Sequence, residues 1–249
     1  VDGVSFNILE GETLGIVGES GCGKTTLGRT LIKLVDPTSG LIRFNGEDIT
    51  HKSQREMRKL RSQMQIIFQD PYSSLNPRIT IGSAIMEPMT VHGIYANEKE
   101  RKEKTIELLQ KVNMKAEHFN RYPHEFSGGQ RQRVSMARAL YQDADVYVFD
   151  DPLSALDAHV GRHVFNEAIN GLLVKKSRIL VTHQMSYLSY ATRIYVADAM
   201  KITEEKVPTQ VSEQPEPNEA VLVSMLRAWQ QTSNANTASP KSPSHISPT

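Results

Sequence analysis

The sequence predicts an α/β fold with a mostly parallel sheet and an inserted helical subdomain. Short apolar strands alternate with amphipathic helices along most of the chain, and such alternation is typical of parallel sheets. A long helical stretch interrupts this alternation between the strands expected at 64–68 and 146–149. We therefore expect residues 1–204 to form one domain, with the helical subdomain inserted at about 78–141.

The first elements surround a cluster of glycines. The apolar run at 13–17 predicts a buried strand. Residues 24–35 predict a helix that carries Leu27, Leu31 and Leu34 on one face. The Asp-Pro step that follows cannot continue this helix, so we expect the helix to end there.

The remaining elements follow from the same periodicities. Apolar runs predict strands, and the run at 41–44 leads into an Asn-Gly turn. The charged segment at 51–63 is expected to be a solvated helical face. Strands are expected at 4–8, 41–44, 64–68, 146–149 and 178–182, helices at about 78–112 and 130–141, and one more helix between the last two strands. Because nothing precedes the strand at 4–8, we expect a true first strand to be missing from this chain.

Composition narrows the class of protein. The 249 residues suffice for one large domain, and 29 Lys and Arg balance 28 Asp and Glu, so bulk attraction to nucleic acid is not expected. Cys22 is the single cysteine, which rules out an intrachain disulfide and suits a reducing compartment. The sequence contains no apolar run long enough to span a bilayer and no signal pattern at its start.

The C-terminal segment at 205–249 differs from the rest. Half of the 12 prolines lie in it, among Ser, Thr, Asn and Gln, so we expect it to be mostly disordered. One short helix is expected at 219–231. Its apolar stripe, which we expect to pack on the core or on a partner, consists of Val221, Leu222, Met225, Leu226 and Trp229.

A glycine-rich loop predicts a phosphate-binding site. Residues 18–25, GESGCGKT, fit the pattern G-x-x-x-x-G-K-[ST], with a predicted strand before the loop and a predicted helix after it. The glycines let backbone N–H groups turn toward phosphates, and the helix N-terminus adds positive potential there. Lys24 is expected to reach the β and γ phosphates, and Thr25 to hold Mg²⁺.

Two adjacent carboxylates follow the predicted strand at 146–149. Asp150 lies at the strand end, where a carboxylate can complete the Mg²⁺ site with Thr25. Asp151 stands next to it, where a chain that hydrolyses ATP is expected to carry Glu. Asp is shorter by one methylene, so its carboxylate is drawn back from an attacking water by roughly 1 Å. This predicts tight ATP binding with slow turnover.

The stretch FSGGQRQRVSMARAL at 126–140 predicts a second anion-binding helix start. A serine and two glycines open an amphipathic helix, so free N–H groups are available at its N-terminus. One chain then has two phosphate-binding helix starts that lie far apart in sequence. We expect them to meet on one nucleotide when two chains dimerise head to tail.

Together these motifs resemble the ATP-binding domain of ABC transporters, from the first residues to about Ile202. The resemblance implies a P-loop NTPase (RecA-like) fold with an antiparallel β part, and ATP and Mg²⁺ as cofactors. It implies a phosphate loop at 18–25, a signature motif at 127–130 that follows Phe126 in place of the usual Leu, and a D-loop that contains Asp157. The implied ATP-binding residues are Gly18, Glu19, Ser20, Gly21, Cys22, Gly23, Lys24, Thr25, Thr26, Ser127, Gly128, Gly129, Gln130 and Asp157.

The same resemblance assigns the chemistry. It implies Thr25, Gln69 and Asp150 as metal ligands, and catalytic roles for Lys24, Gln69, Asp151 and His183. The loop QDPYSSLNPR, which begins at Gln69, is similar to the surface with which transporters meet their membrane subunits. Transmembrane permease subunits or domains are therefore the expected partners, along with a second ATP-binding domain, identical or different, and the cytoplasmic face of a membrane is the expected location.

The two parts of the chain resemble different subfamilies. Residues 1 to about 140 are similar to dipeptide and oligopeptide importer ATPases, whereas residues from about 141 to 202 are similar to the first nucleotide-binding domain of multidrug-resistance-associated exporters. Two origins are consistent with this double resemblance. The chain is either a chimera joined near VSMARAL or a single lineage that approaches both patterns.

Three functions follow. The first is an ATPase subunit that couples MgATP-driven dimerisation to transport, with a peptide substrate by the N-terminal resemblance and organic anions or conjugates by the C-terminal one. The second is a nucleotide-dependent clamp with little catalysis. The third is a soluble ABC ATPase of repair or translation, against which the loop that begins at Gln69 argues.

Overall fold

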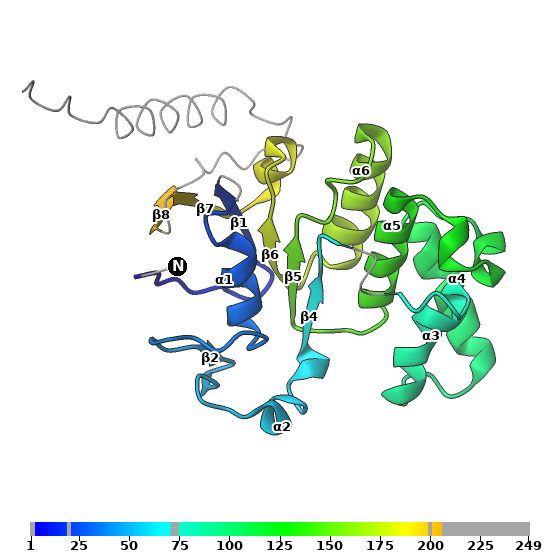
Figure 1. The fold of residues 1–249 in the computed structure, drawn as a ribbon, viewed down its shortest axis with the longest axis horizontal. Coiled ribbons are helices and arrows are strands. Elements are labelled where there is room, and N and C mark those ends of the chain that lie inside the picture. Colours follow the sequence, from blue (N-terminus) through cyan, green and yellow to red (C-terminus); the bar gives the residue numbers. More distant parts are fainter. Residues whose placement is uncertain (1–2, 19–20, 71–74, 199–200, 206–249) are drawn as a thin grey trace, which may run out of the picture. The chain divides into compact units, whose positions relative to one another are not determined.

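The computed structural model describes residues 3–18, 21–70, 75–198 and 201–205. The predicted helix at 219–231 and most of the predicted C-terminal segment lie outside these residues. The described chain contains a six-stranded sheet in the order β4-β5-β6-β1-β7-β8 (Figure 1). Its strands are β1 Thr13–Gly18, β4 Met64–Ile67, β5 Val146–Asp150, β6 Ser177–Val181, β7 Arg193–Asp198 and β8 Lys201–Glu205.

Five of these strands are parallel, and β8 pairs with β7 in the antiparallel direction. The prediction of a mostly parallel α/β sheet is therefore confirmed. Register places the carboxyl ends of the strands along one edge: Ile16 pairs with Val181, and Asp150 pairs with Val181 on its other side. The chain segments that follow β1, β5 and β6 thus begin side by side.

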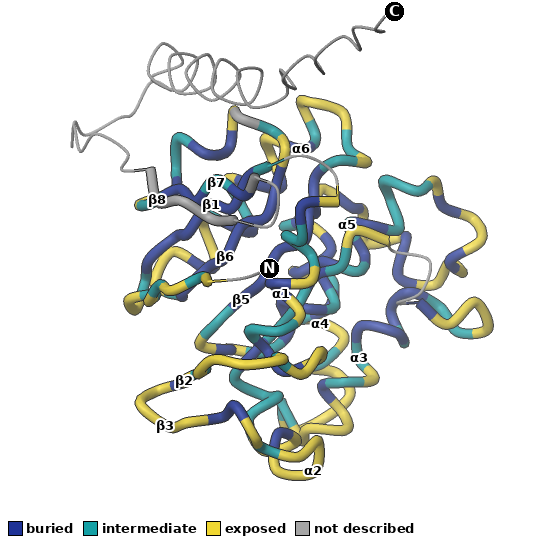
Figure 2. The backbone as a smooth tube through the Cα atoms, turned by 60° about the vertical axis from the view of Figure 1, so that its left-hand side comes forward, coloured by how far each residue is buried: buried dark blue, intermediate teal, exposed yellow. Residues whose placement is uncertain are grey.

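Both faces of the sheet are covered, which explains why its central strands are apolar throughout rather than alternating. On one face Leu14, Val148 and Ile179 pack with Leu27 of α1, Lys24–Leu31. On the other face Phe149 and Leu180 belong to a separate cluster with the helices that follow β4 and β5. In Figure 2 the strands in the middle of the sheet are mostly buried.

Helix α1 ends earlier than predicted. It stops at Leu31, because Lys33 adopts a left-handed conformation (φ 55°) and the N–H of Leu34 bonds the Arg29 carbonyl at 2.9 Å. The Lys33 amine is buried and donates to the carbonyl of Thr50 at 2.6 Å. Leu34 is consequently 43% exposed and does not belong to the apolar face assigned to it. The prediction of a helix to residue 35 was wrong because a tertiary contact fixes the end.

The predicted Asn-Gly turn is present and joins two short strands, while the strand predicted at 41–44 is confined to its last two residues. Strands β2, Arg43–Phe44, and β3, Glu47–Asp48, pair antiparallel, and Asn45 and Gly46 both have positive φ, as a type I′ turn requires. The charged segment that follows forms only the short helix α2, Gln54–Met57, and a 3₁₀ turn, η1 Arg61–Gln63. Most of the hairpin is exposed (Figure 2).

The predicted strand at 4–8 is absent from the described structure. This segment has no strand partner, and Phe6 instead lies against Tyr195 of β7 with ring centroids 5.2 Å apart. Phe6 and Ile8 pack against the apolar cluster on this face of the sheet, and Arg193 donates a hydrogen bond to Asn7. The extended β-type sequence was therefore misleading, because a strand requires a neighbouring ladder.

Helices occupy the region between β4 and β5, as predicted. The stretch expected at 78–112 is divided into α3, Ile81–Val91, and α4, Glu98–Lys111. Gly93, with φ 64°, ends α3. Two short 3₁₀ helices, η3 Ala116–Asn120 and η4 Pro123–Glu125, lead into α5, Gly128–Ala139.

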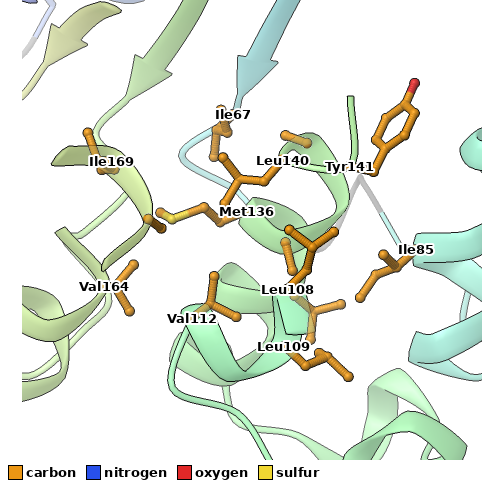
Figure 3. Packing of buried hydrophobic residues seen from close by; sticks show 14 of the residues in the cluster. Ile67, Ile85, Leu108, Leu109, Val112, Met136, Leu140, Tyr141, Val164 and Ile169 are labelled. Carbon is orange, nitrogen blue, oxygen red and sulfur yellow. The ribbon is translucent and has the colours of Figure 1, made fainter. Parts of the chain in front are cut away.

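These helices share one apolar cluster with the sheet. Figure 3 shows Leu108 and Leu109 of α4 and Met136 of α5 in this cluster, together with Ile67 at the end of β4. The predicted helix between β5 and β6 is α6, Ala158–Val164, which continues as a π-helix, η5 Phe165–Leu172. Another 3₁₀ helix, η6 Met185–Tyr190, precedes β7. This packing holds α5 against the end of β4.

Candidate functional site

The predicted phosphate loop lies between β1 and α1, at the carboxyl edge of the sheet. Gly21 and Gly23 have positive φ, and Gly23 is the N-cap of α1 with no side chain of its own to cap the helix. Gly18 is tightly packed, since a Cβ on it would lie 2.1 Å from the Ala197 carbonyl oxygen. Glu19 and Ser20 lie outside the described residues. The loop thus leaves the first N–H groups of α1 without a side-chain partner from the cap residue.

Lys24 and Cys22 contact each other beside the end of β1. The Lys24 amine donates to the Gly18 carbonyl at 2.8 Å and contacts the Cys22 sulfur at 3.5 Å. Cys22 is buried, whereas Thr26 is exposed in the first turn of α1. Lys24 is thereby held over the end of β1, next to the helix N-terminus where an anion is favoured.

Thr25 and Asp150 meet across 125 residues of sequence. The Thr25 hydroxyl donates to Oδ1 of Asp150 at 2.8 Å. Burial raises the pKa of Asp150, while the hydrogen bond from Thr25 and the charge of Arg29 act in the opposite direction. A hydroxyl and a carboxylate so placed are the oxygen ligands that Mg²⁺ takes beside a phosphate loop. The residues present therefore fit the predicted metal, with Gln69 as the third.

A cleft of about 810 Å³ opens beside this pair. Gln69 lines the cleft together with Thr25 and Asp150, so the three predicted metal ligands share one cleft. Arg29 and Phe68 also line it, and the guanidinium carbon of Arg29 lies 5.5 Å from the centre of the Phe68 ring. The full lining is Thr25, Arg29, Leu34, Val35, Phe68, Gln69, Asp70, Asp150, Ser154 and Ala155.

Asp151 and His183 also meet, as the order of strands requires. Nδ1 of His183 lies 2.9 Å from Oδ2 of Asp151. Oδ1 of Asp151 accepts from the hydroxyl of buried Thr182 at 3.3 Å. Asp151 is itself buried and has a left-handed backbone (φ 49°), while its N–H bonds the Val181 carbonyl. Both carboxylate oxygens of Asp151 therefore have partners on the segment that follows β6.

The second predicted helix start is the N-terminus of α5. Ser127 caps the helix by accepting from the N–H of Gln130 at 3.3 Å, and Gln130 returns a bond to the Ser127 N–H. A Cβ on Gly128 would meet nothing within 4 Å, whereas one on Gly129 would lie 2.7 Å from the Ala155 carbonyl oxygen. Ser127–Gln130 do not line the cleft beside Thr25. Asp157 caps α6 by accepting from the N–H of Val160 at 3.0 Å.

Sequence reasoning missed four residues that the structure places around these groups. Thr182 precedes His183 directly, and this adjacency was a usable signal. Arg29, Phe68 and Gln132 had no signal in one sequence, because their contacts join separate elements. Gln132 is buried on α5 and donates to the Phe68 carbonyl at 2.9 Å.

A parallel sheet, a glycine loop opening a helix, and a strand-end carboxylate bonded to Thr25 define a nucleotide-binding protein of the P-loop class. A family model described as ABC transporter matches residues 1–154. The chain therefore belongs to the ABC transporter family and is one of its ATPases. The dimeric structure of the ATP-binding cassette MJ0796 bound to ADP and Pi has a TM-score of 0.75 and 28% identity, covering 82% of this chain and 89% of that one.

Relatives of known sequence agree with this assignment. The oligopeptide transport ATP-binding protein OppF of Bacillus subtilis (strain 168) is 44% identical over 219 residues, 86% of this chain and 72% of OppF. The oligopeptide transport ATP-binding protein AppF of the same organism is 53% identical over 167 residues, 67% of this chain and 50% of AppF. The chain thus spans between half and three quarters of the length of these two relatives.

The comparisons do not support the two-parent interpretation. The alignment with OppF covers 219 residues in a chain of 249, so it must cross the expected junction near VSMARAL. A single relative is therefore similar to the chain on both sides of that junction. The similarity to exporters rests on short strand and loop segments, which different branches of one family can share. Among the described residues, no helix is long and apolar enough to cross a membrane.

Proposed function

We propose that this chain is the ATP-binding and ATP-hydrolysing subunit of an ABC importer for oligopeptides. The observation that carries the proposal is the Thr25–Asp150 hydrogen bond of 2.8 Å, which assembles the metal-binding half of a P-loop site. The names of OppF and AppF support a peptide substrate. Permease subunits at a membrane are the partners, and Gln69 and the loop that follows it are the proposed contact.

The residues of the site have distinct proposed roles. Backbone N–H groups of the loop at 18–25 and the Lys24 amine bind the phosphates. Thr25, Asp150 and Gln69 hold Mg²⁺, which neutralises charge on the phosphates when bound. Asp151 and His183 orient the attacking water at the γ-phosphate. Lys24 stabilises the charge that develops there.

A second copy completes the proposed site. Ser127, Gly128, Gly129 and Gln130 of one copy approach the nucleotide held by the other, with Asp157 beside them. The open space above Gly128 supports this approach, because nothing in the described chain needs a glycine there. The dimeric state of the MJ0796 cassette also supports it.

Slow turnover is part of the proposal. Asp151 has a short side chain, and both of its oxygens are already engaged by Thr182 and His183. The same observation favours a second candidate function, a nucleotide-dependent clamp that dimerises on ATP with little catalysis.

The test compares Lys24→Ala with the unchanged chain. We expect Lys24→Ala to weaken MgATP binding by more than tenfold, measured by equilibrium binding, and to abolish ATP-dependent dimerisation. Lys99→Ala, on an exposed lysine of α4, is the matched control and should change neither. Unaltered nucleotide retention in Lys24→Ala would overturn the proposal.

A further inference from the structure

Phe68 joins two helices that belong to different parts of the proposed site. Its carbonyl accepts a hydrogen bond of 2.9 Å from Nε2 of Gln132, which lies in α5. Its ring lies under the guanidinium of Arg29, which lies in α1. Gln69 follows Phe68 directly in the chain, so Phe68 connects Gln69 to both α1 and α5.

Gln132 is poorly explained as a stabilising residue. Its side chain is buried, with 1% of the residue exposed. Its amide nitrogen has the Phe68 carbonyl as partner, but its amide oxygen is buried and has no hydrogen-bond partner in the described chain. A buried amide that makes one bond and leaves its oxygen unpaired adds little net stability.

The start of α5 is fixed at two points, and both belong to the walls of the cleft. One point is the Gln132–Phe68 bond. The other is the close packing of Gly129 on the carbonyl of Ala155. Phe68 and Ala155 both line the cleft of about 810 Å³ that contains Thr25 and Asp150.

We propose that Gln132 is a positioning residue, which sets the N-terminus of α5 relative to Gln69 so that nucleotide bound at Thr25 and Asp150 brings Ser127–Gln130 into position for a second copy. This inference rests on the proposed function. Gln132 touches neither the phosphate loop nor the strand-end carboxylates, so it acts through Phe68. Nucleotide affinity of a single copy and association of two copies are therefore separable.

The first variant is Gln132→Met in the full chain, which keeps the side-chain volume and removes both the donor and the unpaired oxygen. We expect ATP-dependent association, measured by light scattering over a range of protein concentrations with saturating MgATP, to weaken about tenfold. ATP affinity of the single copy should stay within about twofold, and Tm should shift by less than about 2 °C. Gln142→Met is the matched control, since the Gln142 amide oxygen is equally buried and unpartnered, and it should leave association unchanged.

The second variant, Gln132→Glu, separates positioning from packing. A protonated glutamic acid can donate to the Phe68 carbonyl, whereas a carboxylate cannot. Burial raises the pKa of such a group, so association of Gln132→Glu should be stronger at pH 6 than at pH 8, while Gln132→Met should show no such rescue.

The outcomes separate the two proposals. Equal association of Gln132→Met and the unchanged chain overturns the positioning role and leaves the proposed function in place. A large fall in Tm in Gln132→Met, together with a pH-independent Gln132→Glu, makes Gln132 structural and also overturns it. An unchanged chain that does not associate with MgATP overturns the proposed function, and this inference with it.

Discussion

Oδ2 of Asp151 and Nδ1 of His183 lie 2.9 Å apart, so the second carboxylate of the strand end is directed toward the segment after β6. Thr182 holds the other oxygen of Asp151 from the same segment. Asp151 and His183, which were predicted as separate site residues, therefore form one polar group with Thr182, which was not predicted. The short side chain of Asp151 limits how far its carboxylate can reach toward the neighbouring Thr25–Asp150 pair.

Lengthening this side chain should accelerate hydrolysis. We expect Asp151→Glu to raise the steady-state ATPase rate by about 10- to 100-fold, because a displacement of ~1 Å in a catalytic group costs about 10²-fold. Asp151→Asn is the control and should bind MgATP without a faster rate. An unchanged rate in Asp151→Glu with intact ATP binding would favour the clamp over the ATPase.

Removing the hydroxyl of Thr182 should destabilise the fold. Thr182→Val leaves one buried oxygen of Asp151 without its donor, for which we expect a loss of about 1–2 kcal/mol in the free energy of unfolding. Urea denaturation followed by circular dichroism measures it. Thr90→Val, whose exposed hydroxyl only bonds the Met86 carbonyl within α3, should change stability by less than about 0.5 kcal/mol. Equal losses in the two variants would contradict a specific role for Thr182.

The two signature glycines should respond differently to the same substitution. Gly129→Ala places a Cβ 2.7 Å from the Ala155 carbonyl oxygen, so we expect a destabilisation of about 1–3 kcal/mol, measured by thermal unfolding. Gly128→Ala meets nothing within 4 Å and should leave the single copy as stable as before. According to the proposed function it should still impair ATP-dependent dimerisation. Full dimerisation of Gly128→Ala would argue against a close approach there.

The ion pair of Glu12 and Arg193 should make stability depend on pH. Burial raises the pKa of Glu12, but the hydrogen bonds from Arg193 and Leu9 and the charge of Arg193 together bring it below its ordinary value. A depressed pKa means that the native state binds protons less readily than the unfolded chain. Stability from this pair is therefore complete above the unfolded pKa of about 4.3 and is lost as pH falls through the lower folded value.

The comparison is between the unchanged chain and Glu12→Gln, measured by urea denaturation from pH 7 to pH 3. We expect Glu12→Gln to be less stable at pH 7, and the difference to shrink below about pH 4.3. Glu103→Gln, on an exposed residue of α4, should track the unchanged chain. A difference that stays constant across this range would rule out the ion pair as its source.

The sequence predicted those parts of the fold and site that depend on local patterns. The glycine loop, the strand before it and the Asn45-Gly46 turn are set by residues that are close together in the chain. The meeting of Thr25 and Asp150 followed from the parallel sheet, because strand carboxyl ends share one edge.

The features that were missed depend on contacts between distant elements. The end of α1 is fixed by the buried amine of Lys33 on the Thr50 carbonyl, and no pattern in residues 24–35 shows this. Nothing in the sequence of α5 marks Gln132, because its partner, Phe68, lies 64 residues away. The segment at 4–8 has strand-like residues, and only the ladder pattern of the folded sheet reveals that it remains unpaired.

The packing of Gly18 determines which substitutions in the phosphate loop can be interpreted. A side chain at position 18 collides with the backbone of β7, so reduced activity there would report misfolding as readily as weakened nucleotide contact. Gly21, with open space around its Cα, would sense the phosphates without disturbing the sheet, although its φ of 85° restricts the choice to residues that tolerate this conformation, such as Asn. Substitution of Gly21 therefore tests nucleotide contact, whereas substitution of Gly18 confounds nucleotide contact with folding.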